Sequence, residues 1–265
     1  MSGELRYVYA VCRPFEAPLQ AELTGVGGAP AKTLRHGDLI AVVSAVPEED
    51  FAEQPLRAHL EDLDWLSATA RAHQSVIAAL TTVTCPLPLR LATVFRDDSG
   101  VRTLLEDEGD RFRRTLDRLD GRVEWGVKIH AQPQAEAPAP AQESAAGARP
   151  AAASGRDYLR RRREQQRSRE AGNERADAFA DRLHAELTRH AEATRLHAPQ
   201  NPSLTRESGR NVLNAAYLVP RQLSEAFVEL VDRTKDEAAD LPGLRVELTG
   251  PWAAYSFADP EGMES

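Results

Sequence analysis

A segment rich in proline, alanine and glutamine divides this chain of 265 residues and constrains its fold more than any other feature. It runs from Gln132 to Gly155, reads QPQAEAPAPAQESAAGARPAAASG, and lacks large apolar side chains. Such a segment cannot bury enough surface to offset the entropy that it loses on ordering. We therefore predict a Pro/Ala-rich linker at 132–155 between an N-terminal domain at 1–131 and a C-terminal domain at 156–265, each long enough to bury a core.

The first of these domains shows strand and helix patterns in turn. Alternating or continuous apolar runs indicate strands, and apolar side chains spaced three and four residues apart indicate helices. Pro55 stands just inside the start of the first helix, and Gly121 follows the end of the second. We predict strands at 5–12, 32–46 with a turn at 36–38, 82–95 and 122–130, and helices at about 55–80 and 100–120. This order favours an α+β fold, a ferredoxin-like α/β sandwich.

The second domain is predicted to be a smaller α+β unit with a long helix. Residues 156–197 are helix-forming but mostly polar, with sparse apolar positions, so much of that helix should be solvated. A strand at 209–221, an amphipathic helix at 222–240 and a strand at 243–250 follow. Gly250-Pro251 is expected to end that last strand.

Charge and hydropathy restrict the class of protein. The formal net charge is −8, which argues against a generic nucleic-acid binder. No run of eighteen apolar residues occurs, so no membrane partner or membrane span is expected. The first residues lack the basic segment and apolar stretch of a signal peptide. These features indicate a soluble, cytoplasmic protein.

Motifs for catalysis or cofactor binding are missing from the sequence. GVGGAP at 25–30 lacks the Lys-Ser/Thr pair of a phosphate-binding loop, and no serine lies in a GxSxG turn. Cys12 and Cys85 belong to no metal-ligand pattern, and no two histidines have the spacing of a helical metal site. Glu124, between Val123 and Trp125, is the carboxylate singled out as a candidate, and strand alternation predicts that it faces water. We expect no catalytic residue, cofactor, metal or small-molecule substrate.

A basic cluster lies near the start of the long helix. Its members are Arg160, Arg161, Arg162 and Arg163, continued by Arg167 and Arg169. Glu164 and Glu170 interleave with them, which favours a solvated helix face with i, i+4 ion pairs. The alternative is a patch for an acidic partner protein or for nucleic acid. Because no aromatic residues interleave for base stacking, a protein partner is preferred over nucleic acid.

Seven segments in this order resemble the GvpL/GvpF family of gas vesicle proteins. They are YVYAV, LIAVVSAVP, AHQSVIAALTTVTCPLPLRLATVF, VEWGVKIH, RDYLRRRR, NAAYLVPR and LTGPWAAYSF, which together span both predicted domains. The resemblance implies a minor accessory and structural component of gas vesicles, without enzymatic activity. It also implies that the protein binds the small hydrophobic wall protein, prevents its aggregation and assists vesicle nucleation and assembly with other accessory proteins. A nucleic-acid-binding regulator acting through the Arg-rich helix is the alternative from a different class.

An aromatic stretch near the end of the chain has two interpretations. Trp252, Tyr255 and Phe257 follow Gly250-Pro251 within GPWAAYSF, in a chain with only 6% aromatic residues. They can pack onto the second domain as anchors, because aromatic side chains bury much apolar area. Part of the cluster can instead stay exposed as an apolar contact for the wall protein. The anchor is preferred, since an exposed aromatic tail would itself promote aggregation.

Overall fold

The computed structural model describes residues 3–17, 23–132, 155–198, 209–239 and 243–258, and the chain divides into two compact units. Unit 1 comprises Met1–Trp125, Leu218–Gln222 and Gly250–Ser265, and unit 2 comprises Gly126–Tyr217 and Leu223–Thr249. Apart from its first and last residues, the predicted linker lies outside the described part of the chain.

This division differs from the predicted boundaries at two points. Strand β6 (Arg122–Ala131) contributes residues to both units, so the first unit ends within that strand at Trp125 rather than after it. The end of the chain belongs to unit 1 rather than to the second unit, because Ala253 and Tyr255 pack in the core of unit 1. The expectation that 250–265 forms part of the C-terminal domain is thereby corrected.

Unit 1 combines one sheet with five helices among its described residues. Its elements are β1 (Glu4–Cys12), the 3-10 turn η1 (Val26–Gly28), β2 (Lys32–His36), β3 (Leu39–Pro47), α1 (Glu48–Phe51), α2 (Glu53–Glu61), α3 (Leu63–Thr81), β4 (Leu87–Pro88), β5 (Val94–Phe95), α4 (Asp98–Asp107), α5 (Gly109–Leu119), the start of β6, and the 3-10 turn η3 (Tyr255–Phe257).

The two helices predicted for unit 1 are each divided in two. Asp62 has an extended conformation between α2 and α3, and its Oδ1 accepts the backbone N–H groups of Asp64 and Trp65 at 2.9 and 3.2 Å. This N-cap begins a new helix where side-chain spacing alone indicates a continuous one. Glu108 similarly separates α4 from α5. The spacing of apolar side chains continues through both helix breaks. This spacing therefore does not predict where the breaks lie.

The sheet of unit 1 has the order β2-β3-β1-β4, and β5 also pairs with β1. Strand β1 runs antiparallel to β3 from Glu4 opposite Pro47 to Cys12 opposite Ile40. The β2-β3 hairpin turns at 37–38, where Gly37 adopts φ +59°, as the predicted turn requires. Every residue of β1 from Tyr7 to Cys12 is buried, so both faces of this strand are covered.

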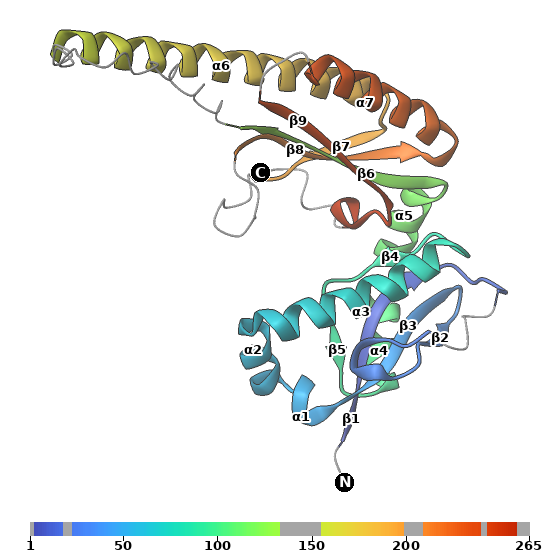
Figure 1. Cartoon of the computed structure of the whole chain (residues 1–265). Helices are drawn as coiled ribbons and strands as arrows, with labels where there is room; N and C mark the ends of the chain where they lie inside the picture. The colour runs from blue at the N-terminus through green and yellow to red at the C-terminus, as the bar shows by residue number, and fades with distance from the viewer. Residues whose placement is uncertain (1–2, 18–22, 133–154, 199–208, 240–242, 259–265) are drawn as a thin grey trace. The chain divides into compact units, whose positions relative to one another are not determined.

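One helix covers the sheet of unit 1 on the side that holds its aromatic core. Helix α3 lies across β1 (Figure 1) and buries Val76, Ile77 and Leu80 against Tyr7 and Tyr9. Helices α4 and α5 bury a separate set of apolar side chains, Val101, Leu105, Phe112, Leu116 and Leu119. Unit 1 thus has a core on which the end of the chain can dock.

Unit 2 is built around a four-stranded sheet of order β7-β8-β6-β9. Its further elements are α6 (Gly155–Arg189), β7 (Ala193–Leu196), β8 (Arg210–Pro220), the 3-10 turn η2 (Arg221–Leu223), α7 (Ser224–Ala239) and β9 (Leu244–Trp252). Helices α6 and α7 lie on the same face of this sheet (Figure 1). The order β-α-β-β-α-β is that of a ferredoxin-like unit.

Both sheets place their first strand between their third and fourth, and the α+β class is confirmed. Between β1 and β2 of unit 1, the described residues 13–17 and 23–31 include the 3-10 turn η1 and no α-helix, whereas a ferredoxin-like unit has a helix there. Among the described residues, the complete ferredoxin-like element order therefore occurs in unit 2 rather than in the N-terminal unit. Strand β9 also continues through Gly250-Pro251 to Trp252, so this dipeptide does not end it.

Candidate functional site

The aromatic stretch forms a short tail that packs into unit 1. Ala253, Ala254 and Phe257 are buried, and Tyr255 is half-buried in η3. The Tyr255 ring packs against the core cluster, with its centroid 6.2 Å from that of His73 on α3. The anchor interpretation is therefore correct for Tyr255 and Phe257. Its predicted location on the second domain is wrong, because the tail contacts the core of unit 1.

A buried carboxylate fixes this tail. Glu124 on β6 accepts the backbone N–H of Ser256 at 2.8 Å and its hydroxyl at 2.7 Å. Arg118 Nη2 donates to the carbonyl oxygen of Phe257 at 2.5 Å. Glu124 is only 8% exposed, so the prediction that it faces water is wrong. Strand alternation could not reveal the tail, which covers this carboxylate and donates two hydrogen bonds to it through Ser256.

Trp252 differs from the other two aromatic residues of the stretch. It is 43% exposed at the end of β9, whereas Phe257 is 7% exposed. Among the three predicted contact residues, Trp252 therefore offers the largest accessible aromatic surface. Tyr255 and Phe257 serve mainly to hold the tail.

His73 and Tyr7 form a buried polar pair beneath the tail. The Tyr7 hydroxyl accepts the backbone N–H of Ala92 at 3.0 Å and lies 3.0 Å from His73 Nδ1. Burial lowers the pKa of His73 to about 4, so its imidazole is neutral near pH 7. A neutral Nδ1 can accept the hydroxyl hydrogen of Tyr7. This pair orders the loop that carries Ala92, and its role is structural.

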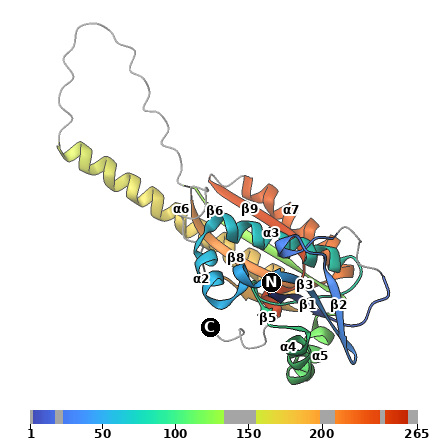
Figure 2. The same cartoon turned by 90° about the horizontal axis from the view of Figure 1, so that it is seen from below.

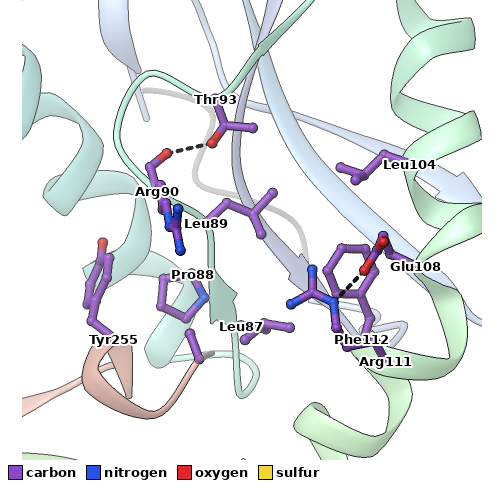
Figure 3. A pocket seen from close by; sticks show the side chains of 11 residues that line it. Leu87, Pro88, Leu89, Arg90, Thr93, Leu104, Glu108, Arg111, Phe112 and Tyr255 are labelled. Carbon is purple, nitrogen blue, oxygen red and sulfur yellow. Dashed lines mark hydrogen bonds and ion pairs between the residues drawn. The ribbon is translucent and has the colours of Figure 1, made fainter. Parts of the chain in front are cut away.

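A hollow of about 620 Å³ lies beside the tail, within unit 1 (Figure 3); we call it the β4 groove. Three segments line it: β4 with the loop that follows, the α4–α5 region, and the tail. The lining residues are Leu87, Pro88, Leu89, Arg90, Thr93, Leu104, Glu108, Arg111, Phe112, Tyr255 and Ala258. This volume lies in the range of ligand-binding pockets, about 300–1,000 Å³.

Among the described lining residues, the charged side chains of the β4 groove are those of Arg90, Arg111 and Glu108. Arg111 Nε donates to Glu108, and the Arg111 guanidinium lies 4.9 Å from the centroid of the Phe112 ring. Arg90 is exposed on the opposite wall. Among the described lining residues there is no histidine, cysteine or serine, and Glu108 is paired with Arg111.

The predicted arginine cluster lies on α6 in unit 2, whereas the tail and the groove belong to unit 1. Arg160, Arg161, Arg162 and Arg163 are all exposed. Helix α6 begins to bury side chains at Ala176 and continues with Phe179, Leu183 and Leu187. The N-terminal half of α6 extends past the sheet of unit 2 (Figure 2). As predicted, much of this helix is solvated.

Sequence reasoning did not identify the β4 groove. Pro86 and Pro88 indicate only a bent or edge strand, and the leucines of α4 indicate only a core face. The groove arises because the helix breaks at Glu108 and because the tail comes back to unit 1. Neither event has a local sequence signature. Across the described ranges, no cluster of three or more potential metal ligands is found, and no helix is both long and apolar enough to cross a membrane.

Comparisons with known proteins agree on one family. The sequence model described as gas vesicle synthesis protein GvpL/GvpF matches residues 5–259. Gas vesicle protein L of Streptomyces sp. (strain CB03234) is 62% identical over 257 residues, which cover 97% of this chain and 94% of that protein. Gas vesicle protein F of the same strain is 28% identical over 260 residues, covering 96% of this chain and 99% of that protein.

Two solved structures share the fold. The crystal structure of the gas vesicle protein GvpF from Anabaena sp. PCC7120 gives a TM-score of 0.67 at 19% identity and covers 97% of each chain. GvpF from Microcystis aeruginosa gives 0.66 at 19% identity, covering 96% of this chain and 99% of that one. Both likenesses extend over the two units.

Proposed function

Because the chain belongs to the GvpL/GvpF family of gas vesicle synthesis proteins, we propose that it is a minor accessory component that binds the small hydrophobic wall protein of gas vesicles. In this role it prevents aggregation of the wall protein and assists nucleation and assembly of the vesicle, together with other accessory proteins. It acts in the cytoplasm and at the gas vesicle. The observation that carries the proposal is the family match across nearly the whole chain.

A soluble partner can keep the apolar wall protein dispersed in water. Exposed apolar surface drives association, and a partner that covers this surface keeps the client dispersed. The net charge of −8 gives a complex of the two proteins a repulsive surface. The β4 groove and the exposed Trp252 supply apolar contact area next to charged side chains. These features support a binding role without catalysis.

Co-expression of the tagged protein with the wall protein tests this function. We expect the wall protein to be recovered in the soluble fraction and to elute with the tagged protein during gel filtration. Retention through that step requires a Kd of about 1 μM or tighter, equivalent to roughly 8 kcal/mol of binding free energy. Insoluble wall protein beside a soluble, folded tagged protein would contradict the proposal.

In this function, the arginine cluster of α6 binds an acidic accessory protein. Arginine binds carboxylates in a bidentate manner, and the cluster holds no lysine. Residues 160–163 are exposed, so a partner can reach their side chains. The preference for protein over nucleic acid rests on the interleaved Glu164 and Glu170 and on the lack of stacking aromatics between them.

Replacing Arg160, Arg161, Arg162 and Arg163 with alanine is expected to leave the fold intact and to weaken binding of the acidic partner by about tenfold or more. The estimate assumes about 0.2–1 kcal/mol for each exposed charge pair. Pull-down titrations with the other gas vesicle accessory proteins at 50 and 300 mM salt measure the loss. The matching lysine variant retains the charge and should bind with intermediate affinity. A salt-sensitive shift of nonspecific DNA that the alanine variant abolishes would instead support the nucleic-acid alternative.

A further inference from the structure

We propose that this protein associates with a second copy of itself, through an acidic leucine patch on unit 1 of one copy and the exposed start of helix α6 on unit 2 of the other. The acidic leucine patch comprises Leu60 and Leu63 together with the charged residues of the segment 48–64. This association goes beyond the proposed function, because it joins two copies of the chain rather than the chain and the wall protein.

The acidic leucine patch lies where α2 meets α3 (Figure 1). Leu60 is 38% exposed and Leu63 is 71% exposed, although both continue the spacing of apolar residues by three and four along these helices. The N-cap at Asp62 begins α3 anew, and the buried side chains of α3 start only at Thr69. The helix break thus leaves two leucines in water, where contact with another molecule can bury them.

The support beneath the two leucines is rigid. The His59 ring of α2 stacks on the Trp65 ring of α3, with ring centroids 4.9 Å apart and an interplanar angle of 10°. Trp65 also packs against Phe51, with centroids 5.4 Å apart, and against the core cluster of unit 1. The leucines therefore hold their positions before a partner arrives, which lowers the entropy cost of binding.

The charge around the patch is strongly negative. Residues 48–64 carry seven carboxylates and one arginine, a net charge of −6 with histidine neutral. Glu61 and Asp64 flank the two leucines and are exposed. A partner that complements this patch presents apolar side chains among cationic ones.

The start of α6 has this composition. Tyr158 is 61% exposed and Leu159 is 53% exposed. Residues 156–170 carry seven arginines and three carboxylates, a net charge of +4. Because residues four apart are neighbours on a helix surface, Tyr158 lies beside Arg162 and Leu159 beside Arg163. Each exposed apolar side chain of this segment therefore shares a face of α6 with an arginine.

Both complementary surfaces belong to this chain, which favours a second copy as the partner. The described part of the chain has eight exposed large apolar side chains, and only these two places bring two of them within three residues along the sequence. The two pairs lie in segments of opposite charge, so contact between them buries four apolar side chains and brings carboxylates to guanidinium groups. Since the two surfaces differ, the contact is heterologous, and assemblies larger than a dimer can form.

The arginines of this contact are those to which the proposed function assigns an acidic accessory protein. One set of guanidinium groups cannot hold both partners at the same time. An acidic accessory protein that binds the arginine cluster is therefore expected to separate associated copies.

Sedimentation velocity over a range of about 1–100 μM protein measures the association. The mass of the unmodified protein should rise with concentration above the monomer mass of 29.1 kDa. Raising the salt to about 500 mM should shift this rise to a concentration at least about threefold higher, because salt screens exposed charges. Unmodified protein that stays monomeric throughout this range would overturn the proposal.

Two variants each remove one side of the contact. Leu60→Ser combined with Leu63→Ser removes the apolar surface of the patch, and the alanine variant of Arg160–Arg163 removes the arginines. Each variant alone should be folded by circular dichroism and should associate at least about tenfold more weakly than the unmodified protein. An equimolar mixture should form a dimer and nothing larger, because the two variants can make only one intact contact. Val83→Ser is the control, since Val83 is 37% exposed outside both surfaces and its replacement should leave association unchanged.

The mixture also separates a second copy from other partners. Association of either variant to the same extent as the unmodified protein would overturn the proposal, as would a mixture that forms no dimer. If the unmodified protein stays monomeric but holds another accessory protein that the double leucine variant loses, the patch belongs to that partner and not to a second copy. Recovery of soluble wall protein is measured separately, so failure of this proposal leaves the proposed function in place.

Discussion

Phe257→Ala is expected to lower the free energy of unfolding of unit 1 by about 3 kcal/mol, because removal of a buried phenylalanine side chain leaves a cavity. Phe257 is 7% exposed, and the same turn is held by Glu124 and Arg118. Loosening this turn also moves Tyr255 and Ala258, which line the β4 groove.

Urea unfolding followed by circular dichroism measures this effect, and hydrogen exchange locates it. Amides of β1 and β3 in unit 1 should lose protection, whereas those of α7 in unit 2 should not. Trp252→Ala is the matched control, since Trp252 is 43% exposed and its removal should cost less than about 1 kcal/mol. Equal destabilisation by both variants would show that the tail does not anchor unit 1 through Phe257.

Much of the fold could be predicted from local patterns. The strands at β1 and β3, the turn at Gly37, the long polar helix and the amphipathic α7 each have a period or a turn residue that physical rules recognise. The breaks at Asp62 and Glu108 were not predicted, because a helix can begin again without interrupting its apolar stripe. The arrangement of the strands was only partly foreseen, since the order of a sheet depends on pairings between distant residues.

The site was harder to predict than the fold. Glu124 lies between apolar neighbours in a strand, and nothing nearby indicates that Ser256 covers it from 132 residues away. The sequence of the aromatic stretch predicts that it is an anchor. It does not predict that the stretch packs against the core of unit 1, because that contact joins residues far apart in the chain. Arg160 to Arg163 were placed correctly on a solvated face, because α6 lacks apolar residues there. Local exposure was therefore predictable, and long-range contact was not.

Acidification from pH 7 to pH 4 is expected to remove about 3 kcal/mol of stability from unit 1 through His73 alone. His73 is 3% exposed, and burial lowers its pKa to about 4 in the folded state. In the unfolded state the pKa is about 6.5. Above pH 6.5 the imidazole is neutral in both states and imposes no penalty. Between these two values the unfolded chain binds a proton that the folded one does not, so stability falls as the pH falls and levels off below pH 4.

Comparison of unmodified protein with His73→Gln isolates this contribution from that of the carboxylates. Urea unfolding at pH 4, 5, 6 and 7 measures the free energy of unfolding of both proteins. For His73→Gln this free energy should decrease less between pH 7 and pH 4. At pH 7 it should be lower than in the unmodified protein, because the contact with Tyr7 changes. His190→Gln, at an exposed position, is the control and should retain the pH dependence of the unmodified protein. Parallel curves for unmodified protein and His73→Gln would show that His73 takes up its proton without unfolding. In that case water would reach His73 in the folded state. The Tyr255 ring, which packs beside His73 and lines the β4 groove, would then not be held in a closed core.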